Sequence, residues 1–406
     1  MKILLINQSF VPPDEPGHTR HFEMAKYLGE CGHEMVIVAS DSNYQTGLRT
    51  VKRKGLFIEQ TIEGVRVLRA YSAQTLHRSY VWRAISFLSF MVSSVWAALH
   101  VKDVDLVMGT TPPIFQAVSA WVVAFVRRKP FLLEVRDLWP EFAVSMGVIR
   151  NPLIIRLAHG LEKFLYERAA HLLVNSPAYK DYIVRKGVPE QKITFIPYGT
   201  DIRMFNPDID GSSVRARLGF TDQFVVLYAG AMGQAHDLYT VLRAAQRLKD
   251  APDIQFVFFG AGKERPALEA EAARLGLTNV RFAGTTPKKE MPAVIAAADV
   301  CLAILQDLEM FRTTYPNKVF DYMASARPTV LVIDGVVREV IEASKGGVFV
   351  EPGDDERLAK TIFELSRDPQ RVRQMGENAR AYLVNHLDRR DKLAETRQLL
   401  ERLAAR

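Results

Sequence analysis

The sequence predicts an α/β protein built from two doubly wound domains that face each other across a cleft. The chain has 406 residues, 48% hydrophobic and 24% charged, which suits a globular protein of two domains. Apolar strand-like runs alternate with amphipathic helix-like segments, as in parallel sheets covered by helices. The alternation starts afresh near residues 195–205, which predicts the domain boundary and a hinge there.

In the first half, an apolar run at 2–10 predicts a buried strand, and the helical periodicity of 21–32 ends at Gly32. Ser176 and Pro177 suit the N-cap and the first position of a later helix. The other strands of this half are expected within 33–40, 65–72, 105–113, 129–137, 171–177 and 192–201.

The second half repeats the pattern, and a charged helix is expected at 388–406. Such sheets bind ligands beyond the carboxyl ends of their strands. Strands are expected within 224–233, 254–264, 279–286, 300–305, 328–334 and 347–352, and helices within 237–250, 264–276, 288–299 and 337–347.

The net positive charge lies in the first half. Residues 1–195 contain 24 Lys and Arg against 17 Asp and Glu, a net charge of +7, whereas residues 196–406 contain 29 of each. A basic half implies an anionic partner. Without aromatic-rich nucleic-acid signatures or a basic recognition helix, the partner is expected to be a phosphorylated substrate or an anionic membrane rather than nucleic acid.

Two further features indicate a cytoplasmic protein. Cys31 and Cys301 lie in apolar runs, as buried thiols of a reducing compartment do. The sequence opens directly on a strand-like run rather than on a signal peptide.

The stretch "YPNKVFDYMASARP" (315–328) predicts a nucleotide site. Pro316 disfavours a helical conformation for the residue before it, and Asn317 is a good N-cap, so a helix is expected to begin here. Lys318 and Asp321 then share one face of its first turn. A helix start with a lysine suits a phosphate, and the carboxylate suits the diol of a ribose. The alternative is a solvated helix face with a weak ion pair.

Two more loops of the second half follow strands. In "YAGAMGQAHD", Gly230 and Gly233 would let a ligand approach the backbone. In "GAGKERP", Gly260 and Gly262 would do the same, and Lys263 offers a point charge to a phosphate. Each loop alone is often only a turn, but three such loops in one domain favour nucleotide binding.

Several stretches of the chain resemble the family 4 glycosyltransferases of the GT-B fold, which has two Rossmann-like domains. The resemblance extends over nearly the whole chain, and its long central stretch is the most specific. "EVRDLWPE" further resembles the bacterial subgroup that builds O-antigen and capsule repeat units on a polyprenyl carrier, including N-acetyl-fucosaminyl transferases. The matching stretches are "GHEMVIVAS", "VNSPAYKDYIVRKGVPEQKITFIPYGTDIRMFNP", "GAGKERPALE", "AAADVCLAIL" and "YPNKVFDYMASARPTV".

The resemblance implies roles for both halves. Residues 1–198, with a returning C-terminal helix at about 386–406, would bind the acceptor, and residues 199–385 would bind the nucleotide-sugar. Asp321 would hold the ribose hydroxyls, although the family usually has the longer Glu there. Lys318 and Lys263 would neutralise the diphosphate.

The second half departs from the family pattern at two places. Thr313 stands where a second acid is common, so contacts to the donor sugar would fall to Thr313, Thr314 and backbone N–H groups. Ala231 and His236 stand where an Arg and a Lys are common. Neutralising the phosphates would therefore also involve Arg312.

The first half departs from the pattern as well. Arg136 before Asp137 stands where many members have a His before an Asp near the sugar. Arg136 would be a charge clamp, and the alternative is a structural pair of the two side chains. The loop "PDEPGHTRHF" resembles the family's glycine loop, in which Gly17 and His18 would begin a helix that binds a phosphate or acts on the acceptor hydroxyl. The alternative for His18 is a surface histidine.

We expect chemistry without a metal ion. The Asp-x-Asp pattern occurs twice, at Asp103–Asp105, before a strand, and at Asp208–Asp210, in a linker turn. Two lysines and helix starts are available for the diphosphate, so no cofactor is needed beside the substrate nucleotide-sugar.

Two uncharged runs, 84–99 and 114–126, raise the question of a membrane. Both are shorter than the ~20 residues that span a bilayer. Basic residues flank them, including 127–129, and the basic run 49–54 lies in the same half, which suits docking on an anionic surface. The alternative is that both runs are helices packed on the sheet.

These observations predict a retaining glycosyltransferase, cytoplasmic and peripheral on the inner face of the plasma membrane. It would move an N-acetylated or deoxy sugar from a nucleotide donor, most simply UDP-linked, to a polyprenyl-diphosphate-linked or polysaccharide acceptor. The alternatives are a UDP-sugar 2-epimerase type of isomerase and a non-catalytic membrane-associated assembly protein of the same fold.

Overall fold

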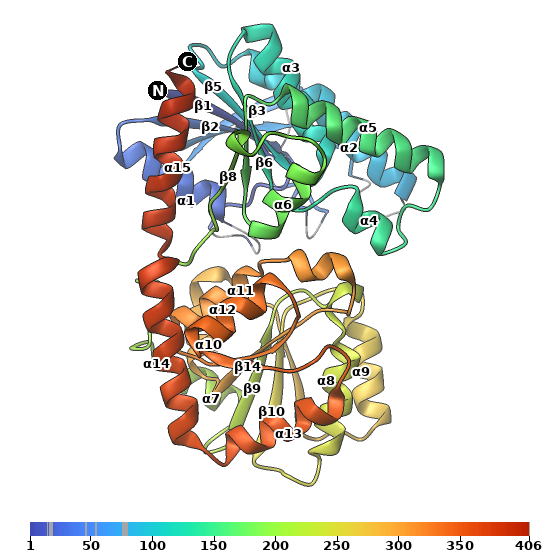
Figure 1. Ribbon diagram of the computed structural model, residues 1–406, viewed down its shortest axis with the longest axis vertical. Helices are drawn as coiled ribbons and strands as arrows, with labels where there is room; N and C mark the ends of the chain where they lie inside the picture. The colour runs from blue at the N-terminus through green and yellow to red at the C-terminus, as the bar shows by residue number, and fades with distance from the viewer. Residues whose placement is uncertain (14, 16–18, 45–46, 53–54, 75–79, 406) are drawn as a thin grey trace. The chain divides into compact units, whose positions relative to one another are not determined.

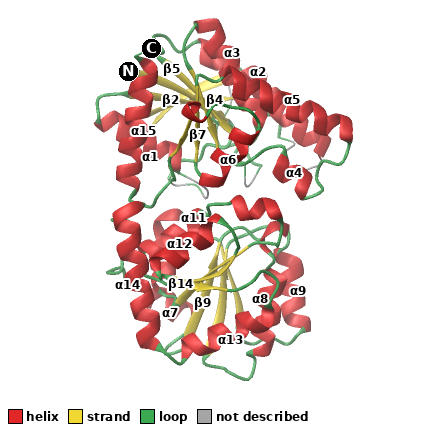
Figure 2. Cartoon of the chain, viewed as in Figure 1, coloured by secondary structure: helices red, strands yellow, loops and turns green. Residues whose placement is uncertain are grey.

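The computed structural model describes the chain except residues 14, 16–18, 45–46, 53–54, 75–79 and 406. It divides into two compact units, an N-terminal unit of Met1–Pro197 with Leu393–Arg406 and a C-terminal unit of Tyr198–Lys392. Figure 1 shows the course of the chain, and Figure 2 shows the strands of each unit enclosed between helices. Both units are the expected α/β domains.

The described part of the N-terminal unit contains an eight-stranded sheet in the order β3-β4-β2-β1-β5-β6-β7-β8. Its strands pair in parallel except β3, which is antiparallel to β4 at the edge. β3 was not expected from the sequence because its polar, half-exposed residues lack an apolar run. The bounds are β1 Lys2–Ile6, β2 Glu34–Ser40, β3 Phe57–Ile62, β4 Val65–Ala70, β5 Leu106–Thr111, β6 Phe131–Val135, β7 His171–Val174 and β8 Ile193–Phe195.

The helices of the N-terminal unit include both uncharged runs of the sequence. Ser176 and Pro177 take the N-cap and first helical position of α6, as expected. The bounds are α1 Arg20–Glu30, α2 Tyr80–Leu99, α3 Ile114–Arg127, α4 Glu141–Ser145, α5 Pro152–Arg168, α6 Pro177–Arg185, η1 Glu190–Lys192 and α15 Arg389–Ala404.

The last helix, α15, completes the core of the N-terminal unit. Its residues Leu399, Leu400 and Leu403 are buried in one cluster with Ile3 and Leu5 of β1. His33 adds a polar contact, because its Nε2 lies 2.9 Å from a carboxylate oxygen of Glu401. The N-terminal unit is therefore built from both ends of the described chain.

The C-terminal unit has a six-stranded parallel sheet in the order β11-β10-β9-β12-β13-β14. Its first strand, β9, lies in the middle, with β10 on one side and β12 on the other. The strand order therefore reverses direction between β9 and β12, which is where sheets of this kind bind ligands. The bounds are β9 Phe224–Ala229, β10 Ile254–Phe259, β11 Val280–Gly284, β12 Val300–Ile304, β13 Thr329–Val332 and β14 Gly347–Phe349.

Helix α11 begins at Asn317, with Pro316 at the N-cap position, which is one residue earlier than the prediction of Asn317 as the N-cap implied. Its buried residues Val319, Phe320 and Tyr322 fix the helix against its unit. The bounds of the helices in this unit are α7 Ser212–Leu218, η2 Gln234–His236, α8 Leu238–Arg247, α9 Arg265–Arg274, η3 Lys288–Glu290, α10 Met291–Ala296, η4 Glu309–Thr313, α11 Asn317–Ala324, α12 Val336–Ser344, α13 Asp355–Ser366 and α14 Pro369–His386.

Candidate functional site and a buried network of the N-terminal unit

The glycine loops after β9 and β10 pack against each other. A Cβ on Gly260 would lie 1.8 Å from the carbonyl oxygen of Gly230, and one on Gly262 would lie 2.1 Å from that of Met232. Both glycines are therefore explained by loop packing. Gly233 differs, because a Cβ there would meet nothing within 4 Å. Of these three glycines, Gly233 alone is left available for a close ligand.

Lys318 of α11 lies beside the end of β9. Its Nζ donates to the hydroxyl of Tyr228 at 3.2 Å and sits 4.3 Å from the centroid of that ring. Gly230 makes room for it, because an added Cβ would come 2.5 Å from Nζ. Among the described residues no carboxylate lies within ion-pair distance of this amine, and desolvation lowers the pKa of Lys318 to about 7. A buried amine without an acid partner is a ready site for an anion.

Three buried polar atoms, one in the loop after β9 and two beside the start of α11, have no hydrogen-bond partner among the described residues. They are Nδ1 of His236, Oγ1 of Thr314 and Oδ1 of Asn317. Burial, and then the charge of Lys318, lower the pKa of His236 to about 3, so its imidazole is neutral. Unsatisfied buried groups are costly unless a ligand completes them. The loop after β9 and the start of α11 thus form one polar site at the reversal of strand order.

The carboxylate of Asp321 is engaged elsewhere. One oxygen accepts from Oγ1 of Thr200 and the other from Nζ of Lys288, both at 2.9 Å. Lys288 also lies over the ring of Phe205, 4.5 Å from its centroid. Lys318 and Asp321 share a helix turn, as the sequence predicted, but they face different partners and form no ion pair with each other.

The other donor-site candidates differ in their surroundings. Lys263 is exposed on the loop after β10. Arg312 is half-exposed and paired, with nitrogens 3.2 Å from Asp307 and 3.8 Å from Asp334. Thr313 donates through Oγ1 to the carbonyl of Met310 at 2.6 Å. Lys263 is thus placed for an external anion, whereas Arg312 would have to leave its carboxylates.

In the N-terminal unit, Arg136 binds backbone carbonyls rather than Asp137. Its Nε donates to the Thr111 carbonyl at 2.9 Å, and NH2 donates to that of Pro112 at 3.3 Å. Burial raises the pKa of Asp137 to about 6, although the charge of Arg136 opposes the shift. The two side chains are therefore not a direct salt bridge. Arg136 fixes the end of β5, and Asp137 follows β6 as a buried carboxyl with a pKa of about 6.

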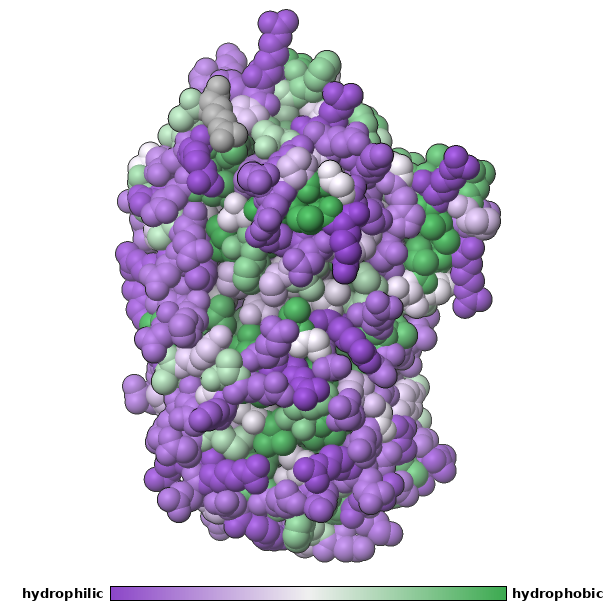
Figure 3. Space-filling model, viewed as in Figure 1, coloured by the Kyte–Doolittle hydropathy of each residue, from purple (hydrophilic) through white to green (hydrophobic). Residues whose placement is uncertain are grey.

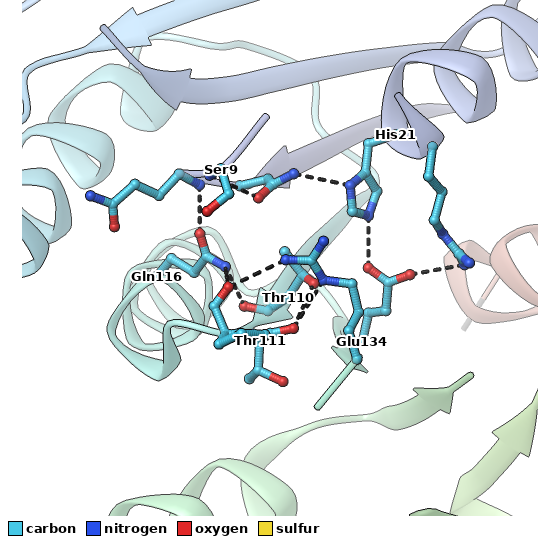
Figure 4. A network of polar contacts seen from close by, with 11 residues as sticks. Ser9, His21, Thr110, Thr111, Gln116 and Glu134 are labelled. Carbon is cyan, nitrogen blue, oxygen red and sulfur yellow. Dashed lines mark hydrogen bonds and ion pairs between the residues drawn. The ribbon is translucent and has the colours of Figure 1, made fainter. Parts of the chain in front are cut away.

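A buried network around Glu134 was not recognised in the sequence (Figure 4). His21 Nε2 lies 2.7 Å from one oxygen of Glu134 on β6, and Arg20 binds the other oxygen at 2.9 Å. Asn7 reaches His21 Nδ1 at 3.0 Å through Nδ2, because its Oδ1 already accepts from the Ser9 N–H.

These contacts settle the protonation of the network. His21 Nδ1 must accept from Asn7, so Nε2 carries the proton and donates to Glu134. Burial lowers the pKa of His21, which agrees with a neutral imidazole. Burial alone would raise the pKa of Glu134, but Arg20 and His21 hold it well below its usual range. The start of α1 is thereby fixed to the sheet by a permanent carboxylate.

Two expectations remain open here. Gly17 and His18 lie outside the described residues. Within the described residues, no group of three or more His, Cys, Asp and Glu side chains is arranged to hold a metal ion.

Sequence reasoning missed Tyr228, Thr200, Lys288 and the Glu134 network. Their partners lie far along the chain, up to 121 residues apart for Thr200 and Asp321. The one available signal was Glu134, an acid inside the apolar strand run "FLLEV", which implies a buried charge with a partner.

Family models match both halves of the chain. The model described as "Glycosyl transferase 4-like domain" matches residues 17–199, and "Glycosyl transferases group 1" matches residues 223–368. The chain is a family 4 glycosyltransferase of the GT-B fold. The predicted fold class and enzyme class are thereby confirmed.

Related proteins span the full length of this glycosyltransferase. The "Putative colanic acid biosynthesis glycosyl transferase WcaI" of Escherichia coli K12 is 24% identical over 416 residues, covering 97% of this chain and 98% of that protein. The sucrose-phosphate synthase of Thermosynechococcus elongatus superposes with a TM-score of 0.78 at 20% identity, covering 100% and 99%. Anabaena HepE, solved in complex with UDP, superposes with a TM-score of 0.73 at 20% identity, covering 99% of this chain and 100% of HepE.

Proposed function

We propose that this glycosyltransferase uses a UDP-sugar and binds its diphosphate at the loop after β9 and the start of α11. The observation that carries the proposal is the desolvated Lys318 amine, which has no acid partner among the described residues, together with the unsatisfied atoms of His236, Thr314 and Asn317 in the same two segments. Lys263 would add a second positive charge. The UDP complex of the structural relative HepE supports the choice of base.

The reaction proposed is transfer with retention of anomeric configuration and without a metal ion. The bond between the anomeric carbon and the diphosphate oxygen breaks, and the acceptor oxygen bonds to the same face of that carbon. The acceptor proton passes to the leaving phosphate. The charge developing on that phosphate is stabilised by Lys318 and the N–H groups at the start of α11. Asp321 would hold the ribose, and Thr313 and Thr314 would contact the sugar.

The acceptor is proposed to bind the N-terminal unit. Arg136 and Asp137 at the ends of β5 and β6, with Gly17 and His18 before α1, are the proposed contacts. We propose a polyprenyl-diphosphate-linked or polysaccharide acceptor of surface glycan assembly, such as O-antigen or capsule, and an N-acetylated or deoxy donor sugar. A lipid-linked acceptor implies a peripheral position on the inner face of the plasma membrane. The colanic acid function in the name of WcaI supports this class of pathway.

Calorimetric titration with UDP, GDP and ADP, with and without EDTA, tests the donor site. We expect UDP to bind, EDTA to have no effect, and Lys318→Met to weaken binding at least about thirtyfold through loss of a charge-assisted contact. Asp321→Asn should weaken binding of UDP but not of inorganic diphosphate. Binding of none of the three nucleotides, in a sample with a cooperative melt, would refute the site and favour the non-catalytic alternative.

A product assay without acceptor then separates transfer from isomerisation. Release of a 2-epimerised nucleotide-sugar would refute the transferase mechanism, whereas slow hydrolysis of the donor agrees with it.

A further inference from the structure

Helix α2 presents an apolar side to solvent. The exposed fractions of these side chains range from 37% for Leu99 to 69% for Val92. Their spacing of three or four residues keeps them on one side of the helix over its length. The exposed apolar residues are Trp82, Ile85, Leu88, Val92, Trp96 and Leu99.

The buried side of α2 carries serines. The hydroxyl of Ser86 lies 2.9 Å from that of Ser72, and Ser93 donates to the carbonyl of Tyr71 at 2.6 Å. Ser94 is also fully buried. An ordinary surface helix buries its apolar side and exposes its polar side, whereas α2 exposes an apolar side and buries three serines beside Phe90, Ala97 and Ala98.

Among the described residues, α2 is the one helix whose length and composition would allow it to cross a membrane, as the window Trp82–Leu99. Its serine side is hydrogen-bonded to the loop after β4, and Phe90, Ala97 and Ala98 are fully buried in the domain. These contacts hold α2 lengthwise on the N-terminal unit. They favour a helix that lies on a surface over one that spans a bilayer.

Two neighbouring helices also carry exposed apolar residues. Helix α2 packs against α3, and α3 packs against α5, as Figure 1 also shows. Figure 3 shows hydrophobic surface over the region of α5. We call the exposed apolar residues of the three helices the apolar ridge; it adds to α2 the residues Phe125, Val126, Leu153, Ile154 and Leu157.

The charges beside α2 and α3 are basic, and on α5 the exposed Glu167 lies 3.9 Å from Lys163. Helices α2 and α3 contain no Asp or Glu. Arg83 on α2, Arg128 and Lys129 after α3, and Arg156 on α5 are exposed. Apolar side chains with tryptophans, flanked by arginine and lysine, suit the boundary between anionic headgroups and acyl chains.

We propose that the apolar ridge docks this protein on an anionic lipid bilayer, with α2 lying in the plane of the interface. Charge complementarity favours an anionic bilayer, because α2 and α3 contain no Asp or Glu and Arg83, Arg128 and Lys129 beside their apolar residues are exposed. Only the biological purpose of docking rests on the proposed function: docking would hold the enzyme where a lipid-linked acceptor lies. The docking itself does not require catalysis.

Co-sedimentation with vesicles tests the proposal. The wild-type protein should bind phosphatidylcholine vesicles that contain phosphatidylglycerol and bind pure phosphatidylcholine weakly. The pair Trp82→Ser with Trp96→Ser should lower the partition coefficient at least about tenfold. The pair Arg128→Gln with Lys129→Gln should lower it about thirtyfold on anionic vesicles. Phe363→Ser, which removes an aromatic side chain 43% exposed on α13, is the matched control and should bind like wild type.

Other outcomes would overturn docking. One is equal binding by the tryptophan pair and wild type. Another is a change of molar mass in sedimentation velocity caused by the tryptophan pair, which would assign the apolar ridge to a second copy of the chain. UDP titration of the same variants separates this question from the donor site, because docking variants should bind UDP normally. If the wild-type protein binds vesicles but does not bind UDP, the proposed function is refuted and the docking proposal is not affected.

Discussion

The charge of the Lys318 amine is expected to depend on whether an anionic ligand is bound beside it. Without ligand its pKa is about 7, because burial disfavours the ammonium form and no described carboxylate compensates. In the unfolded chain a lysine titrates near 10.4. Between pH 7 and about 10 the unfolded state therefore binds more protons, and the free energy of unfolding rises with pH in this window. A bound diphosphate would return the pKa toward its ordinary value.

We therefore predict that UDP binding takes up close to one proton at pH 8. The affinity should fall about tenfold per pH unit between pH 7 and 10, since the binding-competent ammonium becomes scarcer. Calorimetry in buffers of different ionisation enthalpy measures the uptake. Lys318→Arg is the control, because a guanidinium stays charged throughout and should abolish the uptake. Equal proton uptake by this variant would assign the titration to another group.

The residues of the proposed donor site show what the sequence could and could not predict. Lys318, Gly230 and Asn317 could be proposed from the sequence because they belong to one turn or one loop after a strand. The engagement of Asp321 by Thr200 and Lys288 was not found, since it joins distant segments through single hydrogen bonds. Periodicity reports the face on which a side chain lies. It does not report which of several nearby polar groups that side chain will bind.

At the scale of elements, the loops after β9 and β10 are one structure. The N–H of Gly230 donates to Phe259 and that of Met232 to Ala261, both at 2.9 Å, and Glu264 donates back to Met232 at 3.0 Å. Strand alternation predicted both loops and their position at the carboxyl ends. It could not predict that the loops hold each other, because that depends on the lateral order of the strands.

We predict opposite effects for two glycine substitutions in this loop pair. Gly260→Ala should lower the free energy of unfolding by about 2–4 kcal/mol, because its φ of +145° and the Gly230 carbonyl exclude a side chain. Gly233→Ala should change stability by less than about 0.5 kcal/mol, because its Cβ would enter open space. It should nevertheless weaken UDP binding. Urea unfolding and UDP titration of both variants provide the measurements, and unchanged UDP affinity in Gly233→Ala would remove that loop from the proposed site.

At the scale of the whole molecule, the net charge and the tryptophans are unequally distributed between the two units. The net charge of +7 belongs to the first half, and so do all four tryptophans, at positions 82, 96, 121 and 139. Tryptophan fluorescence therefore reports on the N-terminal unit, and UDP binding is proposed to report on the C-terminal unit. The two-domain architecture was predictable because the alternation of strand-like and helix-like segments starts again near residue 200. The elements α5, α13, α14 and β3 were not predicted, because none of them is a simple apolar run flanked by clear turn or capping residues.

We predict that Leu400→Ala destabilises the N-terminal unit alone. The side chain is fully buried in the cluster that joins α15 to β1, so its truncation should cost about 2–5 kcal/mol. The tryptophan-detected melt should move to lower temperature while UDP affinity at 20 °C stays within about twofold. Leu153→Ala on the exposed side of α5 is the control and should leave the melting temperature unchanged. A fall in UDP affinity for Leu400→Ala would show that the units are not energetically separate.

The position of α15 also determines when each unit can fold during synthesis. Domains generally fold as units, and the earlier one usually folds first as the chain leaves the ribosome. Here the C-terminal unit, Tyr198–Lys392, is complete before Leu399, Leu400 and Leu403 have been translated. The N-terminal unit is the first to be synthesised, but its last helix, α15, is translated after the whole C-terminal unit. Its apolar face toward α15 therefore stays open while the rest of the chain emerges, and a nascent chain stalled before α15 would be the form that most needs a chaperone.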